Sequence, residues 1–474
     1  MKRWTVGVAI FLAAAGARAG KPQLDDPIGR ARAEEVKYGV RTPEEQLAIL
    51  RAAEAEAAKY ARNGPLPYAR APGSVWVNLG PTDADFEVNG ATYNKVDSGR
   101  VRKIVVDPRD PNVVYVATAG GGVWKTFDAL TPVTTNPTTG PRWMPITENV
   151  GSLSIGSLAM NPQNPDALLL GLGDPFDVRV PGFLHSEDGG ATWSSSIPLS
   201  YTAGTALNTA TTVRDIAFDP DGLTVLVATN AGLFTNSAGG IGDTTSFSVA
   251  ALGTSIQAAW SIAYVGSHNW LVTSVDATGA SSARRGHLWH GTVSSTTWAW
   301  TDVTSALPGV GADPDLSRMS LAAALISGNN YRVYLLAAQA PGLHAGNADQ
   351  KDVFISSNSG ATWASLNMVP GGRAPRNPQG TSASPDHDQF DLDFIHGQAG
   401  YNQMILVDPK NPDAVFIGGN LAMGRSLNAG TDWDLLTDWL PFGRNFTGWS
   451  PGWGATTYAH ADWHAAAIAH IGTT

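Results

Sequence analysis

One pattern of strands and turns recurs along the chain, and it constrains the fold more than any other feature of the sequence. In the clearest copy, VRKIVVDPRDPNVVYVATAGGGVWKT at 101–126, an apolar strand ends at Asp-Pro, a second apolar strand follows, and a third leads into a Ser/Thr turn. A Trp and a fourth strand come next. Six copies start at Ile104, Ile155, Ile216, Ile262, Leu321 and Ile405. Four strands repeated at this period indicate the blades of a β-propeller.

The repeat is incomplete at its C-terminal end. The segment HADWHAAAIA at 460–469 resembles the first strand of a seventh copy, but no second strand, turn or Trp follows it. The segment SVWVNLGP at 74–81 resembles a fourth strand without its first three. Closing a ring removes exposed sheet edges, so we expect 74–80 and 460–469 to share one blade. The sequence thus predicts an all-β fold, a seven-bladed propeller over 74–474 with its last blade incomplete, in a fragment of a longer protein.

The chain begins with the features of a secretory signal peptide over residues 1–19. Lys2 and Arg3 form a basic start, an apolar run at 6–15 is too short to span a bilayer, and the small-residue site at 17–19 suits cleavage. No other apolar stretch is long enough to cross a membrane, and there is no Cys for a disulfide or a lipid anchor. We therefore expect a secreted protein, extracellular or periplasmic.

Residues 20–73 form a polar leader in which one helix is predicted, over 43–63. Thr42 is its N-cap, Pro43 is its first residue, Glu45 completes a capping box, and Gly64 ends it. The apolar stripe is narrow, which is typical of a surface helix and not of a core element.

The formal charge excludes one class of partner. The chain carries a net charge of −10, and cleavage after residue 19 removes Lys2, Arg3 and Arg18, which changes this to −13. An acidic surface opposes binding to nucleic acid and to anionic membranes. It is compatible with a polysaccharide, a cation or a protein partner.

Three copies of the turn between the third and fourth strands are well formed. In each, Ser precedes an Asp or Asn, which can accept backbone N–H bonds, and a Gly supplies a positive φ. A Trp follows, and we expect it to be buried between neighbouring blades. The copies consist of Ser186, Asp188, Gly190 and Trp193; Ser356, Asn358, Gly360 and Trp363; and Ser426, Asn428, Gly430 and Trp433.

These turns resemble the Asp-box, or bacterial neuraminidase repeat, of sialidases, sortilin-type receptors and xyloglucanases. The resemblance covers roughly residues 74–474 and implies a propeller. It implies a structural role for Asp188, Asn358 and Asn428 on the rim of the blades, away from the central binding face. It also relates the chain to uncharacterised secreted bacterial proteins with the same repeat.

The resemblance to two enzyme groups fails at the residues that carry their chemistry. Sialidases need an arginine cluster, a Tyr nucleophile and usually an Arg-Ile-Pro motif, which is absent here; Arg102 and Arg214 are single in the sequence, and we expect them to be solvated. Xyloglucanases use two carboxylates, one as acid and one as base. The first often lies in a Thr-Asp-x-Gly-Gly segment, where this chain has Ala119. Asp174 is a weak substitute as a catalytic residue, and a turn-forming Asp before Pro explains it better.

A ligand is expected at the loops over the central channel. The loop at 438–459 carries Trp439, Trp449, Trp453 and Tyr458 among glycines. Exposed aromatic faces of this kind suit stacking on sugar rings or contact with a protein partner. A loop that folds around its own aromatic core is an equal alternative.

Two segments offer possible metal ligands, although neither implies a cofactor with certainty. His460, Asp462 and His464 alternate, so a strand would place them on one face, where they could bind Zn²⁺ or form a polar cluster. Asp386, Asp388, Asp391 and Asp393 could bind Ca²⁺, although a solvated acidic loop fits their spacing better.

The sequence thus favours a secreted, non-catalytic propeller that binds a glycan or a protein. The alternative is a xyloglucanase-like glycoside hydrolase with paired carboxylates. A third possibility is an assembly factor similar to the Asp-box propeller of photosystem assembly.

Overall fold

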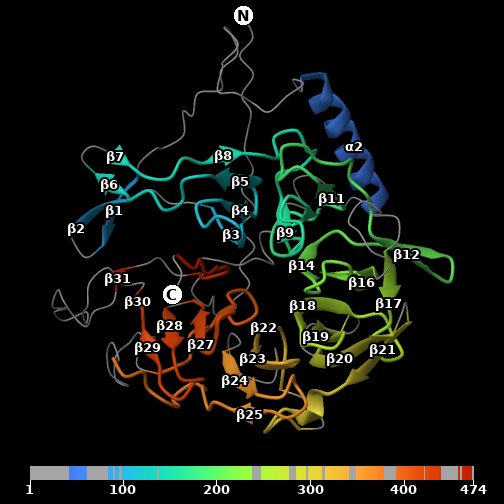
Figure 1. The fold of residues 1–474 in the computed structure, drawn as a ribbon. Coiled ribbons are helices and arrows are strands. Elements are labelled where there is room, and N and C mark those ends of the chain that lie inside the picture. Colours follow the sequence, from blue (N-terminus) through green and yellow to red (C-terminus); the bar gives the residue numbers. More distant parts are fainter. Residues whose placement is uncertain are drawn as a thin grey trace, which may run out of the picture.

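A ring of β-sheets around a central axis forms the body of the protein (Figure 1). The structure is a computed structural model of the chain, and it describes residues 42–60, 84–88, 91–95, 99–135, 138–236, 247–276, 284–294, 297–311, 315–340, 349–377, 391–420, 422–438, 457–458 and 462–471. Five four-stranded sheets and one three-stranded sheet follow one another around the axis in chain order. The predicted all-β propeller is confirmed, with six blades in the described part of the chain.

Each blade is an antiparallel meander whose first strand is the innermost. Blade one consists of β3 (Val101–Val106), β4 (Val114–Thr118), β5 (Val123–Thr126) and β8 (Met144–Pro145). Blade two consists of β9 (Ile155–Met160), β10 (Leu168–Leu172) and β11 (Phe183–Ser186), with a single bridge to Ile197 in the fourth position. Blade three consists of β14 (Val213–Phe218), β15 (Val225–Thr229), β16 (Leu233–Asn236) and β17 (Ser248–Ala250).

The remaining three blades complete the ring. Blade four consists of β18 (Ala258–Tyr264), β19 (Asn269–Val275), β20 (Gly286–Ser294) and β21 (Thr297–Asp302). Blade five consists of β22 (Met319–Ser327), β23 (Asn330–Ala338), β24 (Gln350–Ser356) and β25 (Ala364–Ser365). Blade six consists of β26 (Met404–Asp408), β27 (Asn411–Gly418), β28 (Met423–Ser426) and β29 (Asp434–Leu435).

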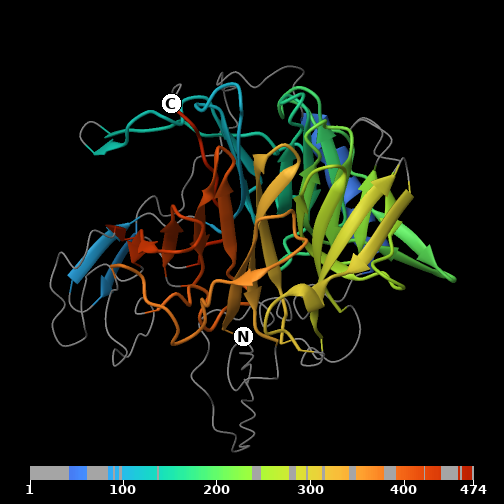
Figure 2. The same ribbon diagram turned by 60° about the horizontal axis from the view of Figure 1, so that its bottom comes forward.

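Short elements lie outside the blades. They are the hairpins β1 (Ala84–Val88) with β2 (Ala91–Lys95), β6 (Thr134–Thr135) with β7 (Thr138–Thr139), and β12 (Ser200–Ala203) with β13 (Ala206–Thr209), the parallel pair β30 (Thr437–Asp438) and β31 (Thr457–Tyr458), and the 3-10 helix Thr304–Ala306. Figure 2 shows the blades from the side, with their strands running in the direction of the axis.

The hydrophobic core lies between blades because both faces of the inner strands are covered. In β10, Leu168 and Leu170 belong to the cluster shared with blade one, whereas Leu169 belongs to the cluster shared with blade three. All three side chains are 0% exposed. A strand buried on both faces is expected to be a continuous apolar run, as the Leu-Leu-Leu sequence is.

The three well-formed turns share one hydrogen-bond pattern. Ser186 Oγ donates to Asp188 Oδ1 and accepts from Gly190 N, and Thr192 N donates to Asp188 Oδ1. The turns that begin at Ser356 and Ser426 repeat these three bonds with Asn in place of Asp. Trp363 and Trp433 are 8% and 1% exposed, as expected, whereas Trp193 is only partly buried.

One helix, α2 (Pro43–Tyr60), packs against the outside of blades one and two (Figure 1). The capping box forms as predicted, since Thr42 N donates to Glu45 Oε2 and Glu45 N donates to Thr42 Oγ1. Leu50 is 2% exposed within the core cluster of blade two, and Glu54 accepts from Ser196 N. The helix is therefore joined to the propeller core through Leu50 and is more than a surface attachment. The predicted signal peptide at 1–19 lies outside the described residues.

The expected seventh blade is represented by residues 462–471, which do not form a strand. The prediction of a regular first strand was wrong, because Asp462 adopts a φ of 78° and the segment follows blade six without ladder bonds of its own. Trp463 N donates to Gly419 O, and His470 Nε2 lies 3.0 Å from Asp408 Oδ1. Figure 1 shows the segment between blade six and blade one. Its expected partner at 74–80 lies outside the described residues.

Candidate ligand site at the propeller axis

Equivalent positions of three blades place large cationic or aromatic side chains around one end of the axis. Arg102 stands two residues before Ile104 in β3, Arg214 two before Ile216 in β14, and Trp260 two before Ile262 in β18. The blades are related by rotation about the axis, so a shared register becomes a shared ring. Arg214 lies over the Trp260 ring, with its guanidinium carbon 3.8 Å from the ring centroid.

The loops at the same end of the blades complete the cluster. Phe176 follows β10, Arg318 directly precedes β22, and Tyr401 precedes β26. The guanidinium carbons of Arg100, Arg102 and Arg318 lie 5.6, 5.4 and 5.4 Å from the Phe176 ring centroid. Arg318 also lies 5.0 Å from the centroid of Trp260. We call Arg100, Arg102, Arg214 and Arg318, with Phe176, Trp260 and Tyr401, the axial arginine cluster.

Two of the four arginines are neutralised by carboxylates. Asp174 is 0% exposed, and its two oxygens lie 2.6 Å from Arg100 Nη2 and 3.2 Å from Arg102 Nε. Asp177 forms a second ion pair with Arg100. Burial acts to lower the pKa of Arg100, but attraction to Asp174, Tyr401 and Asp177 outweighs burial and raises that pKa.

The other two arginines have no carboxylate within ion-pair distance among the described residues. Arg214 Nη1 donates to Ala259 O, and Arg318 Nη1 donates to Tyr401 O, so both bind backbone carbonyls. Burial, together with the neighbouring arginines, lowers the pKa of Arg214 and that of Arg318 to about 9 each. Both guanidinium groups remain positively charged at neutral pH, although burial makes the charged form less favourable than it is in water.

The sequence-based expectation that Arg102 and Arg214 are solvated was wrong. Arg102 is 8% exposed, and Arg214 is partly buried against Trp260. Each looked single because the blades that bring the arginines together are far apart in the chain. One sequence feature does link the two arginines: each stands two residues before the isoleucine of the first strand of its blade.

Asp174 occupies the site but is not placed to act as a catalyst. Besides the two arginines, its Oδ1 accepts hydrogen bonds from Phe176 N and Asp177 N. A general acid must present a proton to the leaving oxygen of the substrate. Asp174 has no exposed surface and is held by two guanidinium groups and two backbone N–H groups, which is the geometry of a structural carboxylate. Ala119, at the expected acid position, donates its backbone N–H to Arg100 O.

The predicted aromatic ligand residues remain a prediction. Trp439, Trp449 and Trp453 lie outside the described residues, and Tyr458 belongs to the short strand β31. The aromatic residues that the structure does place at the axis are Phe176, Trp260 and Tyr401, which no sequence motif marks. Trp260 lies in the inner strand β18, Phe176 follows β10 and Tyr401 precedes β26, so their positions depend on blade assembly and not on a local motif.

One of the acidic metal candidates lies in a group that could hold a metal ion, although with different partners. Asp393 Oδ2 lies 3.1 Å from His396 Nδ1, and Asp349 Oδ1 lies 3.3 Å from the same nitrogen. The three ligand atoms lie within 4.8 Å of one another. Asp391 instead accepts from Gly371 N and Asp393 N, which is a structural role. Asp386 and Asp388 lie outside the described residues.

The second metal candidate is not assembled as expected. Asp462 accepts a hydrogen bond from Asn402 Nδ2. The centroid of the His464 ring lies 4.7 Å from that of Tyr401 and 6.1 Å from that of Phe176. Residues 462–471 form no regular strand, so the alternation alone does not place Asp462 and His464 on one face. His460 lies outside the described residues. His464 thus borders the axial arginine cluster as an aromatic neighbour.

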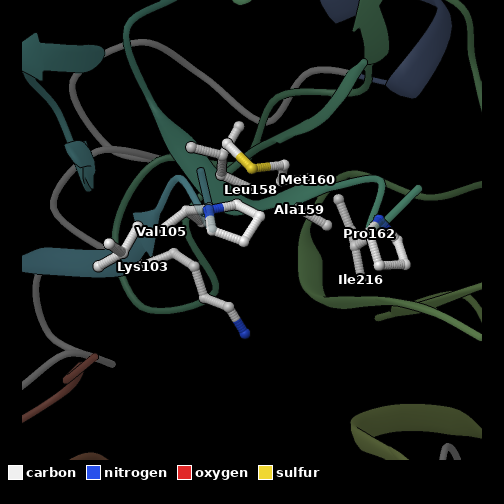
Figure 3. Close-up of a pocket in the computed structure, with 9 residues that line it drawn as sticks. Lys103, Val105, Leu158, Ala159, Met160, Pro162 and Ile216 are labelled. Carbon is white, nitrogen blue, oxygen red and sulfur yellow. The ribbon is translucent and has the colours of Figure 1, made fainter. Parts of the chain in front are cut away.

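The opposite ends of the inner strands surround an apolar hollow of about 320 Å³ (Figure 3). The lining residues come from the later parts of β3 and β9 and from β14: Lys103, Val105, Val106, Pro108, Leu158, Ala159, Met160, Pro162 and Ile216. Lys103 is paired with Asp215 at 3.1 Å. The hollow has no other charged lining group, so the charged chemistry of the described axis is concentrated at the arginine end.

Comparisons with known proteins concern the fold. Neither a family model nor a curated protein matches the sequence. The chain is similar to the GH74 xyloglucanase of Xanthomonas campestris, with 18% identity over 71% of this chain and 45% of that chain and a TM-score of 0.46. An ancestral GH74 enzyme gives 17% identity, 71% and 46% coverage and a TM-score of 0.41. YCF48 from Cyanidioschyzon merolae gives 15% identity, 71% and 84% coverage and a TM-score of 0.36.

The chain thus spans less than half the length of the two GH74 proteins it resembles. Among the described residues, no helix is both long and apolar enough to cross a bilayer.

Proposed function

We propose that this protein is an exported, non-catalytic propeller that binds a glycan or a protein partner at the axial arginine cluster. Loops and strand starts of all six blades meet there, which is where a propeller offers a binding face. Export is supported by the sequence of residues 1–19.

The state of Asp174 carries the non-catalytic part of the proposal. Glycoside hydrolysis needs two carboxylates, one on each side of the scissile bond, with substrate between them. Asp174 and Asp177 are near each other, but both are ion-paired to Arg100. The same guanidinium thus occupies the space in which a sugar ring would have to lie.

Two assays on one purified preparation test this proposal. A glycan and protein binding array should show retention of a ligand, whereas incubation with xyloglucan and other polysaccharides should release no reducing sugar above a blank. Release of reducing sugar that is lost in Asp174→Asn would overturn the proposal in favour of the hydrolase. Arg142→Gln is the control, because Arg142 is an exposed residue of blade one, 87% accessible and paired with Asp128.

A further inference from the structure

Resting on the proposed function, we infer that Arg214 and Arg318 form the receptor for an oxyanion group carried by the ligand, either a sulfate ester, which bears one negative charge, or a phosphate monoester, which bears close to two. The first argument is the balance of charge within the cluster. Among the described residues, the four guanidinium groups of the cluster face two carboxylates, Asp174 and Asp177, which leaves two positive charges without a carboxylate partner. Lys103 and Asp215 pair with each other and do not change this sum.

The second argument is that these two cations are costly as they stand. A charge taken out of water without a counter-ion is destabilising, and an added counter-ion offsets much of that cost. Arg318 is 9% exposed and its neighbours include Arg102 and Arg214. Backbone carbonyls of Ala259 and Tyr401 orient the two guanidinium groups without neutralising them.

The third argument is rigidity. Arg214 has intermediate exposure as a residue, although its Nε is buried. Its guanidinium is held over Trp260 at 3.8 Å, and Arg318 lies near the same ring at 5.0 Å, so the two groups lie around one indole. Guanidinium groups fixed in this way lose little further freedom when they bind an oxyanion, which favours affinity.

The surrounding surface limits how many charges the ligand carries. The whole chain has a net charge of −10, so a heavily charged polyanion is repelled outside the cluster. The ligand that fits is one in which a single sulfate or phosphate group projects from a molecule with little other net charge.

Calorimetric titration with small probes tests the inference. Glucose 6-sulfate and O-phosphoserine represent the two sources of the group, a sulfated sugar and a phosphorylated protein, and glucose and serine, which have no net charge, are their controls. We expect binding of at least one charged probe and of neither control. Arg214→Gln and Arg318→Gln should each weaken that binding at least tenfold, and added NaCl should weaken it in the wild type. Arg332→Gln is the control and should leave probe binding unchanged. It removes an arginine of blade five that is paired with Asp413 of blade six.

Thermal unfolding of the same variants without ligand separates a receptor role from a structural one. Because Arg214 has no counter-ion, Arg214→Gln should unfold at the same temperature as the wild type or higher. Equal binding of charged and uncharged probes, or unchanged binding in both axial variants, would overturn the inference. A glycan or protein retained on the array but unaffected by these variants would leave the proposed function standing. Release of reducing sugar from xyloglucan would contradict the proposed non-catalytic function.

Discussion

Two places in the described part of the molecule hold buried ionisable side chains whose charge is only partly balanced by opposite charges. They are the axial arginine cluster and the Asp393 carboxylate. Asp393 is 2% exposed, and burial raises its pKa to about 6 despite the opposing effect of His396. The raised pKa means that the folded protein binds a proton at this residue more tightly than the unfolded chain does. The charged groups that face the carboxylate are His396, Asp349 and Asp391.

This sign gives a pH-dependent prediction for Asp393→Asn. Stability from the protonated carboxyl is fully present below the unfolded pKa of 3.8 and is lost as the pH rises through about 6. The Asn side chain is neutral at every pH and keeps this stability. The free energy of unfolding of the variant should therefore exceed that of the wild type by about 1–3 kcal/mol at pH 7. The gap should close near pH 4. Urea unfolding at both pH values measures it, and a gap of the same size at both would contradict the assignment.

The residues of the site were the hardest part to predict from the sequence. Arg102 and Arg214 share a register, but 112 positions separate them in the chain, and no local motif joins them. The capping box at Thr42 and the turn at Ser186 were predictable because each depends on side chains within four residues. Long-range convergence of side chains depends on how blades pack, which a repeat pattern alone does not specify.

At the scale of elements, close packing of inner strands sets the positions of the axial side chains. A Cβ added at Gly156 in β9 would lie 1.9 Å from Val213 O in β14 and 2.6 Å from Gly173 O. Both obstacles are backbone atoms, which cannot rotate away as a side chain can. A glycine at this position therefore allows blades two and three to approach each other, and Val213 immediately precedes Arg214.

Gly156→Ala should destabilise the protein by about 1–3 kcal/mol or more, because the new methyl group must push β14 away from β9. The same shift should disturb Arg214 and weaken oxyanion binding. Gly120→Ala is the control, since no heavy atom lies within 4 Å of its added Cβ. Chemical unfolding of both variants measures the difference. Equal stability of the two variants would show that the inner strands adapt.

The strands themselves followed from the sequence because each is a short apolar run between turn residues, and their antiparallel order in every blade agrees with the repeat. The conformation of residues 462–471 did not follow from the sequence, because Asp462 turns the chain where the alternating pattern of residues predicted a strand. Contacts to blade six at Gly419 and Asp408 hold this segment, and His464 reaches the axial cluster. Its placement comes from tertiary contacts that its own pattern does not reveal.

The molecule as a whole is acidic, with a net charge of −10, but it carries a local excess of positive charge on its axis. The ring architecture explains this contrast, because six blades each contribute one or two side chains to a small region. The remaining surface keeps the net charge negative. Such a protein is expected to select an anionic group by its position and to repel extended polyanions.

The most direct test of this central claim is an anomalous diffraction measurement on crystals soaked in selenate, a dianion with the shape of sulfate. The account predicts a selenium peak at the arginine end of the axis, within hydrogen-bond distance of Arg214 and Arg318. The peak should be absent in crystals of Arg214→Gln soaked in the same way. Wild-type crystals without a peak at the axis, or a peak of equal height in the variant, would contradict the account.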